Sequence, residues 1–77
     1  MLAEHDLVAL RADLPEHRLQ RGDTGTIIAV QPASHTYTVE FMTLGGDTVA
    51  LPTLPETQVR AVAPDEIAQA RPLASAA

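Results

Sequence analysis

A polar turn between two glycines, Gly22 and Gly25, leads directly into the most β-prone run of this chain, and it constrains the fold more than any other feature. Glycine tolerates positive φ angles and close backbone approach without a steric cost, so this spacing is typical of a tight turn. Residues 26–30 are rich in β-branched side chains and contain no proline. We therefore expect a strand over residues 24–31, with Asp23 closing the turn before it by a side-chain hydrogen bond.

The predicted strand over residues 24–31 does not alternate strictly, because Ile27, Ile28 and Val30 are all large and apolar. A β-bulge, or a bend of the strand between two sheets, would place all three side chains inside. Before this strand, residues 12–23 are polar and broken by proline. They predict a long excursion that Leu14 and Leu19 fold back onto the sheet.

A second pair of glycines, Gly45 and Gly46, follows the cleanest alternation in the sequence, residues 36–41. One face of that segment carries the apolar side chains and the other face carries polar ones, as a half-buried strand requires. Glycine pairs close hairpins because they tolerate positive φ at consecutive positions. Residues 36–41 and 48–51 are therefore predicted to be antiparallel neighbours.

Two further strands are expected near the ends of the domain, over residues 6–10 and 59–62, which are short and mostly apolar. Pro52 has no N–H to donate, so it should end the fourth strand or lie on an edge. Residues 55–58 are short, polar and led by proline, and a single 3₁₀ turn before the last strand fits them. The total is five strands.

The last part of the sequence, residues 64–77, is predicted to lie outside a single β domain formed by residues 1–63. Pro64 at a helix start, acidic residues after it and Arg71 near the end match the helix dipole, and Pro72 would stop such a helix. A short helix over residues 63–71 is thus expected, or a frayed segment if Ile67 finds nothing to pack on. Residues 73–77 should form a disordered tail.

Composition excludes several functional classes. The chain has 77 residues, a net charge of −5 and no lysine, which disfavours a general nucleic-acid surface. It contains no cysteine, hence no disulfide and no thiolate nucleophile. No apolar run approaches the roughly 20 residues that span a bilayer. The first residues lack the basic and apolar parts of a signal peptide, so a cytoplasmic location is the default expectation.

The residues that could take part in catalysis or metal binding are scattered along the sequence. His5, His17 and His35 lie in separate loops without the close spacing of metal ligands, and Asp13, Glu16 and Asp23 are interpreted as solvated loop carboxylates. Ser34 and Ser75 have no neighbouring base, and the Gly22–Gly25 turn precedes a strand rather than a helix, so it does not match a phosphate cradle. No catalytic residue, metal or cofactor is predicted, and the chain is not expected to be an enzyme.

From Asp6 to Val62 the sequence resembles a family of small bacterial domains of unknown function. The segments that carry this resemblance are Leu7-Val8-Ala9-Leu10, Asp13-Leu14-Pro15, Gly22-Asp23-Thr24-Gly25-Thr26-Ile27, Tyr37-Thr38-Val39-Glu40-Phe41 and Thr53-Leu54-Pro55. The Gly22 to Thr26 element is also similar to KOW-type segments of ribosomal and transcription proteins and to the barrel domain of nitrile hydratase beta subunits. The resemblance implies an all-β, five-stranded SH3-like barrel and supplies no catalytic residues.

Three functional classes stay open. The favoured one is a non-catalytic module that binds a partner protein, for which an acidic surface suits a basic partner, including one to be neutralised. The second is a KOW-like nucleic-acid-binding domain that uses Arg18 and Arg21. The third is an accessory domain for assembly or metal loading of an enzyme. A homodimer would support the modest core that a chain of this length can form.

The predicted partner-binding surface combines the long first loop with the segment before the last strand. Its residues are Leu14, Pro15, His17, Arg18, Leu51, Pro52, Leu54 and Pro55. Such loops flank a groove in SH3-like barrels, and loops held on a rigid scaffold are where binding residues concentrate. The alternative is that Leu14 and Leu54 are plugs at the two ends of the barrel.

Overall fold

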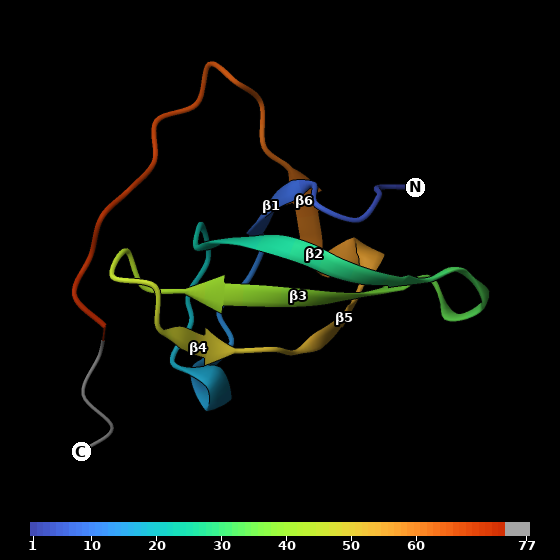
Figure 1. The fold of residues 1–77 in the computed structure, drawn as a ribbon, viewed down its shortest axis with the longest axis horizontal. Coiled ribbons are helices and arrows are strands. Elements are labelled where there is room, and N and C mark those ends of the chain that lie inside the picture. Colours follow the sequence, from blue (N-terminus) through green and yellow to red (C-terminus); the bar gives the residue numbers. More distant parts are fainter. Residues whose placement is uncertain (74–77) are drawn as a thin grey trace.

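The computed structural model describes residues 1–73 and is all-β (Figure 1). Along these residues the elements are β1 (Leu7–Leu10), η1 (Pro15–His17), β2 (Thr24–Gln31), η2 (Pro32–Ser34), β3 (Thr36–Met42), β4 (Thr48–Ala50), β5 (Thr53–Pro55), η3 (Glu56–Gln58) and β6 (Val59–Ala61), where η marks a one-turn 3₁₀ helix. The predicted boundaries of β2 and the 3₁₀ turn before the last strand are confirmed, and β3 is one residue longer than expected.

The strands form one open antiparallel sheet in the order β4-β3-β2-β1-β6, with β5 also paired to β3. β4 pairs with the end of β3 (Phe41 with Ala50), and β5 pairs with its beginning (Tyr37 with Leu54). Between these two ladders the Val39 amide donates a hydrogen bond to the Pro52 carbonyl at 3.0 Å. Pro52 therefore interrupts this edge without ending it, and the structure has six strands where the sequence predicted five.

Pairing at the other end of the sheet joins the two ends of the domain. β1 lies between β2 and β6, with Val8 opposite both Gly25 and Ala61. Within residues 1–73 no strand pairing connects β6 to β4 or β5. The sheet is open by its hydrogen bonds, and the SH3-like barrel stays a prediction.

The bulge predicted in β2 is present, because the register against β3 shifts between Ile27 and Ala29. Its effect on burial differs from the expectation. Ile27 is fully buried, whereas Ile28 is exposed and Val30 is only half-buried. The extra residue is turned outward at the bulge, so the apolar run does not lie wholly inside.

Gly25 of β2 lies directly against the side chains and backbone of β3. A Cβ atom placed on it would lie 2.7 Å from Val39 Cγ1 and 2.9 Å from the Glu40 carbonyl oxygen. Close approach, rather than positive φ, is thus what requires glycine here. Positive φ occurs instead at Gly22 (91°) and Gly46 (95°), so only one glycine of the second pair needs that conformation.

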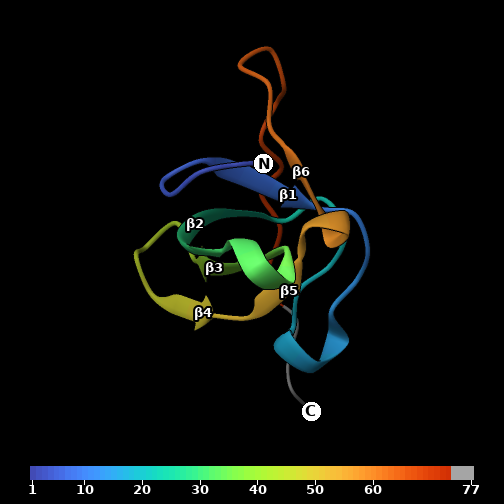
Figure 2. The ribbon, with the colours of Figure 1, turned by 90° about the vertical axis from the view of Figure 1, so that its right-hand side faces the viewer.

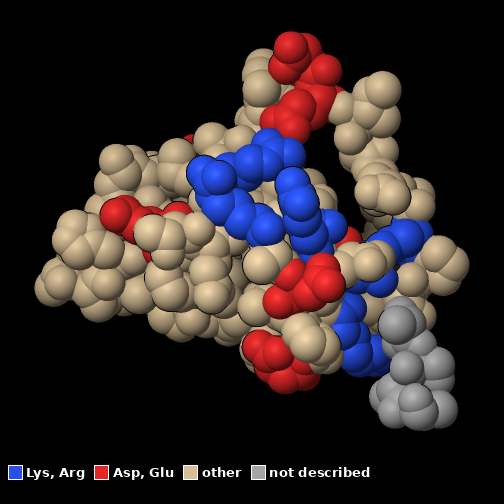
Figure 3. Space-filling model, turned by 180° about the vertical axis from the view of Figure 1, so that it is seen from behind, with Lys and Arg blue, Asp and Glu red and all other residues tan. Residues whose placement is uncertain are grey.

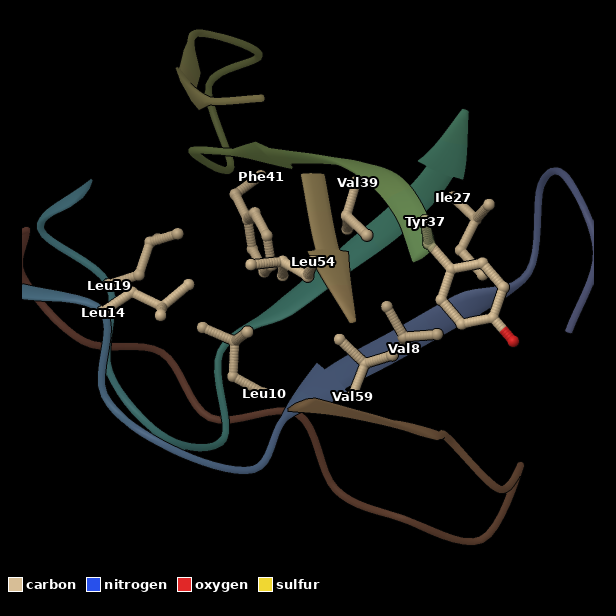
Figure 4. Packing of buried hydrophobic residues seen from close by; sticks show 10 residues of the cluster. All are labelled: Val8, Leu10, Leu14, Leu19, Ile27, Tyr37, Val39, Phe41, Leu54 and Val59. Atoms are coloured by element: carbon tan, nitrogen blue, oxygen red, sulfur yellow. The ribbon is translucent and has the colours of Figure 1, made fainter. Parts of the chain in front are cut away.

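The core lies on the concave side of the sheet, where side chains from β1, β2, β3, β5 and β6 meet (Figure 4). It consists of Val8, Leu10, Leu14, Leu19, Ile27, Tyr37, Val39, Phe41, Leu54 and Val59. Every one of these residues except Leu14 and Leu19 comes from a strand. The two leucines contribute to the core from the first loop.

The predicted helix over residues 63–71 is wrong, because residues 66–73 have no regular secondary structure. One turn forms, in which the Glu66 amide donates to the Ala63 carbonyl at 3.1 Å. The side chain of Ile67 is 96% exposed, so no apolar contact supports further turns. The chain arches away from β6 and returns beside the far end of the sheet (Figures 1 and 2). Residues 74–77, with Ser75 and most of the predicted disordered tail, lie outside the described residues.

Candidate interaction surface

The first loop is held by its two leucines, as the sequence predicted. Leu14 and Leu19 are buried and bridge one another, with the Leu14 amide donating to the Leu19 carbonyl at 2.9 Å and the Leu19 amide donating back at 3.1 Å. Pro15 starts the 3₁₀ turn η1 between them, and Arg18 ends it in the left-handed conformation (φ 61°). The loop is therefore a tight, ordered projection.

Burial divides the predicted partner-binding residues into two groups. Leu14, Pro52 and Leu54 are buried, which matches the alternative in which the two leucines are plugs of the core. A buried side chain cannot contact a partner while the domain stays folded. The members available at the surface are Pro15, Arg18, Leu51 and Pro55, which are exposed, and His17, which is half-buried.

The two halves of that predicted surface meet inside the protein, where Leu14 and Leu54 belong to one apolar cluster. Two cavities lie beside the first loop, and neither is lined by Leu51, Pro52, Leu54 or Pro55. The segment with Leu51 instead follows the edge of β3. Binding by the exposed members remains a prediction.

A larger cavity lies at the other side of the first loop, and we call it the end groove. It has a volume of about 460 Å³. One wall is formed by the body of the domain and the other by the C-terminal segment, defined here as residues 63–73. The body contributes Leu19, Gly22, Asp23, Thr24, Phe41, Met42, Thr43, Leu44 and Val49, and the C-terminal segment contributes Ala68, Gln69, Ala70, Arg71 and Leu73.

The body wall of the end groove is largely apolar. Leu19 and Phe41 belong to the buried core, and Val49 packs against it. At the rim, Met42 is 50% exposed and Leu44 is 98% exposed. Leu44 is carried out of the sheet by the Thr43 to Asp47 turn, which is closed by a hydrogen bond from the Thr43 amide to the Asp47 carbonyl at 2.8 Å. The groove thus joins the core to exposed apolar side chains.

An ion pair between Arg71 and Asp23 holds the C-terminal segment at the end groove. Arg71 Nε donates to Asp23 Oδ1 at 2.9 Å, and Arg71 Nη2 donates to Asp23 Oδ2 and to the Arg18 carbonyl. The two side chains are only 17% and 18% exposed. The contact is bidentate, which is the strong geometry for a guanidinium and a carboxylate.

Asp23 also closes its own turn, as expected. Its carboxylate accepts a hydrogen bond from the Gln20 amide at 2.8 Å, and its own amide donates to the Gln20 carbonyl at 3.0 Å. Burial raises the pKa of Asp23, but the hydrogen bonds from Arg71 and Gln20 and the charge of Arg71 outweigh it and hold the pKa below its ordinary value. The carboxylate is therefore charged and oriented at neutral pH.

A second ion pair fixes the start of the C-terminal segment. Arg60 Nη2 lies 2.8 Å from Glu66 Oε1, and the other carboxylate oxygen of Glu66 accepts a hydrogen bond from the Ala63 amide at 2.7 Å. The hydrogen bond from Arg60 is the main reason that the pKa of Glu66 is lowered. Between the two ion pairs, residues 67–70 are exposed.

Charged residues are mixed on the face seen from behind (Figure 3). Arginine side chains gather there, with carboxylates among them. Within the chain, Arg60 is paired with Glu66 and Arg71 with Asp23. The carboxylates among the arginines make this face less basic than the arginines alone would.

Nothing in residues 1–73 brings three or more histidine, cysteine or acidic side chains together as a metal site. At the surface, His35 Nδ1 lies 3.6 Å from Glu56 Oε1. In the same residues, no helix is long and apolar enough to cross a membrane.

Sequence reasoning missed Arg71, Met42 and Leu44 as residues of a candidate site. Arg71 had been assigned to a helix end, although one signal was present, since it is the only charged residue between positions 67 and 77. Met42 is the last residue of β3 and Leu44 lies in the turn after it, and the sequence held no signal that they would border a groove.

Comparison with known proteins gives one relationship. No curated protein and no solved structure matches the chain. The family model described as "Domain of unknown function (DUF4926)" matches residues 4–61, about three quarters of the sequence. This range holds the six described strands and ends before the C-terminal segment. The chain therefore belongs to the DUF4926 family of domains of unknown function.

Proposed function

We propose that this domain is a non-catalytic module that binds a partner protein at the end groove and the first loop beside it. The observation that carries the proposal is the apolar wall of the groove, which runs from the core out to the exposed side chains of Met42 and Leu44. Apolar side chains that gather at a surface cavity are typical of contact sites, because their burial by a partner releases ordered water.

The first loop adds polar contacts to this surface. Arg18 and Pro15 line a smaller cavity of about 280 Å³ that adjoins Arg71 and Pro72. Arginine is enriched among residues that dominate binding energy, since its guanidinium combines hydrogen bonds with a flat apolar face. The loop and the end groove together form a continuous candidate surface, because Leu19 and Arg71 line both cavities.

The net negative charge of the chain favours a basic partner protein. The chain carries ten acidic and five basic residues, and Arg60 and Arg71 are paired with carboxylates within the chain. Electrostatic complementarity accelerates association and selects among partners more than it adds affinity. An accessory or neutralising role toward a basic bacterial protein is the form of this proposal that best fits the charge.

The SH3-like barrel is part of the same proposal. The pairing of β1 with both β2 and the last strand, and the 3₁₀ turn η3 directly before that strand, support it. In a barrel, the first loop and the β3–β4 turn would project from a rigid scaffold, as binding loops commonly do.

Nucleic-acid binding is the second candidate, and the arginines gathered on one face favour it (Figure 3). Binding to phosphates would have to overcome the carboxylates that lie among them. Loss of binding with rising salt, at a slope set by the number of phosphates contacted, would identify this function. The third candidate is an accessory role in enzyme assembly or metal loading. Its only support is the resemblance to nitrile hydratase beta subunits.

The test is affinity capture from a lysate of the native host with the full chain as bait, followed by mass spectrometry. Leu44→Ser removes an apolar side chain from the rim of the end groove, and Leu51→Ser makes the same change at an exposed residue outside it. We expect a partner that is retained by the parent chain and by Leu51→Ser and is lost with Leu44→Ser. Arg18→Ala should weaken the same capture.

Equal capture by all of these baits would contradict binding at the end groove. Loss with Leu51→Ser alone would move the site to the segment before β5. Pro52→Ala is unsuited to this test because Pro52 is buried.

A further inference from the structure

The C-terminal segment lies against the domain without packing into it. Arg60 and Glu66 hold its start, Arg71 and Asp23 hold its end, and the side chain of Ile67 between them is 96% exposed. Seen from behind, an opening separates the arching segment from the body (Figure 3). Its attachment at the end groove therefore depends mainly on one side chain.

The carboxylate that binds Arg71 belongs to the part of the chain that the family model matches. Asp23 lies within the matched residues 4–61, whereas Arg71 lies outside them. The hydrogen bond from the Gln20 amide orients the Asp23 carboxylate independently of Arg71. The body thus presents a pre-oriented carboxylate that can accept a guanidinium from any chain.

The C-terminal segment also indicates which kind of residue can follow the arginine in a bound chain. Leu73, two residues after Arg71, lines the same groove as Leu19, Phe41 and Val49. An extended chain spans about 7 Å over two residues, so an arginine at Asp23 brings the second residue after it to the apolar wall. The groove matches an extended sequence of arginine, any residue, and an apolar residue.

We propose that the end groove binds such an extended segment of a partner protein, and that the C-terminal segment occupies part of the site in cis as a competitor. This inference rests on the proposed function and names the partner's chemistry. Charge complementarity at Asp23 selects the arginine, and the apolar wall selects the residue that follows it. The competitor acts from an effective concentration on the order of millimolar, so a partner of modest affinity binds only after displacing it.

The test uses a synthetic peptide with the sequence of residues 67–73, titrated into the ¹⁵N-labelled full chain and followed by NMR. In the Arg71→Ala chain the tethered competitor lacks its anchor, so the peptide should bind and shift the amide signals of residues 22–24 and 41–44. The parent chain should bind the same peptide at least tenfold more weakly. Changing the arginine of the peptide to alanine should abolish binding.

Asp23→Asn in the Arg71→Ala chain should lose at least tenfold in affinity for the peptide. The amide spectrum of each variant reports whether it is folded, and the alanine peptide tests the same contact if Asp23→Asn unfolds the domain. Equal binding of the two peptides, or no binding to the folded Arg71→Ala chain, would overturn the inference. A dimer in sedimentation experiments that depends on Arg71 would also overturn it, by assigning the groove to a second copy of the chain.

The two proposals fail separately. If the peptide does not bind but Leu44→Ser still abolishes capture of a partner, only the arginine-containing motif and the competition are refuted. If the peptide binds as expected and capture is insensitive to Leu44→Ser, the proposed function at the apolar rim is refuted.

Discussion

The body of the domain and its C-terminal segment are stabilised in opposite ways. In the body, ten side chains from five strands and one loop form a single buried cluster, and no buried side-chain nitrogen or oxygen in residues 1–73 lacks a hydrogen-bond partner. The C-terminal segment buries no side chain fully and is attached by two ion pairs. Apolar burial contributes free energy in proportion to area. Of the two ion pairs, Arg60–Glu66 is exposed and contributes little, and Arg71–Asp23 is a single, largely buried contact.

This difference indicates separate roles. A region held by a shared core unfolds only with the whole domain, while a region held by one side chain can detach by itself. Attachment of that kind suits a segment that must yield its place to a partner. The comparison predicts large effects for changes in the body and small, local effects for changes in the segment.

The largest effect should come from Leu54→Ala. Leu54 is buried in the core, and truncation of such a leucine costs about 2 to 5 kcal/mol through lost burial and the cavity left behind. Leu51→Ala is the matched control, since Leu51 is half exposed and its change should stay within about 0.5 kcal/mol. Urea unfolding followed by circular dichroism measures both. Similar midpoints would show that Leu54 of β5 does not contribute to the core.

Gly25→Val should destabilise the body by about 1 to 3 kcal/mol, because the added side chain must displace core atoms and a backbone carbonyl. Ser34→Val, at an exposed position of the β2–β3 turn, serves as the control with little expected change. The measurement is again the urea midpoint. Equal midpoints for the two variants would mean that β2 and β3 can separate at Gly25 at no cost.

Truncation after Ala63 should lower the stability of the body by less than about 1 kcal/mol, the range of partly exposed ion pairs. Arg71→Ala in the full chain should have the same effect, since it removes the main attachment of the segment. Thermal unfolding of dilute protein compares the two. A loss of several kcal/mol on truncation would show that the segment is part of the folded body.

Lowering the pH should detach the C-terminal segment from the end groove. Of these changes, it should have the smallest effect on the stability of the body. The pKa of Asp23 in the folded protein lies below the ordinary value of an aspartate, so its ion pair contributes fully above that ordinary pKa and is lost as the pH falls through the lower folded value. NMR signals of residues 68–73 should move toward those of the Arg71→Ala variant as the pH falls below the ordinary pKa of an aspartate. In Asp23→Asn they should already lie there at neutral pH. Signals that stay unchanged to the acid unfolding transition would contradict the role of this ion pair.

Much of the body could be predicted from local sequence. The turn at Gly22, the strand over residues 24–31 and the hairpin through Gly46 follow from glycine conformation and from side-chain alternation. These signals extend over a few neighbouring residues, so they act before the rest of the chain is in place. The bulge in β2 was predicted for the same reason.

The candidate site depended on contacts between distant residues. Arg71 lies 48 positions from Asp23, and nothing near it in the sequence favours that partner over a helix end. The burial of Leu14 and Leu54, the exposure of Ile28 and the continuation of the edge beyond Pro52 were likewise settled by tertiary packing. Local sequence determined where this chain forms turns and strands, because backbone conformation is set by near neighbours. Only the tertiary structure decided which leucines are core and where the C-terminal segment attaches, because burial and ion pairing depend on what lies across the fold.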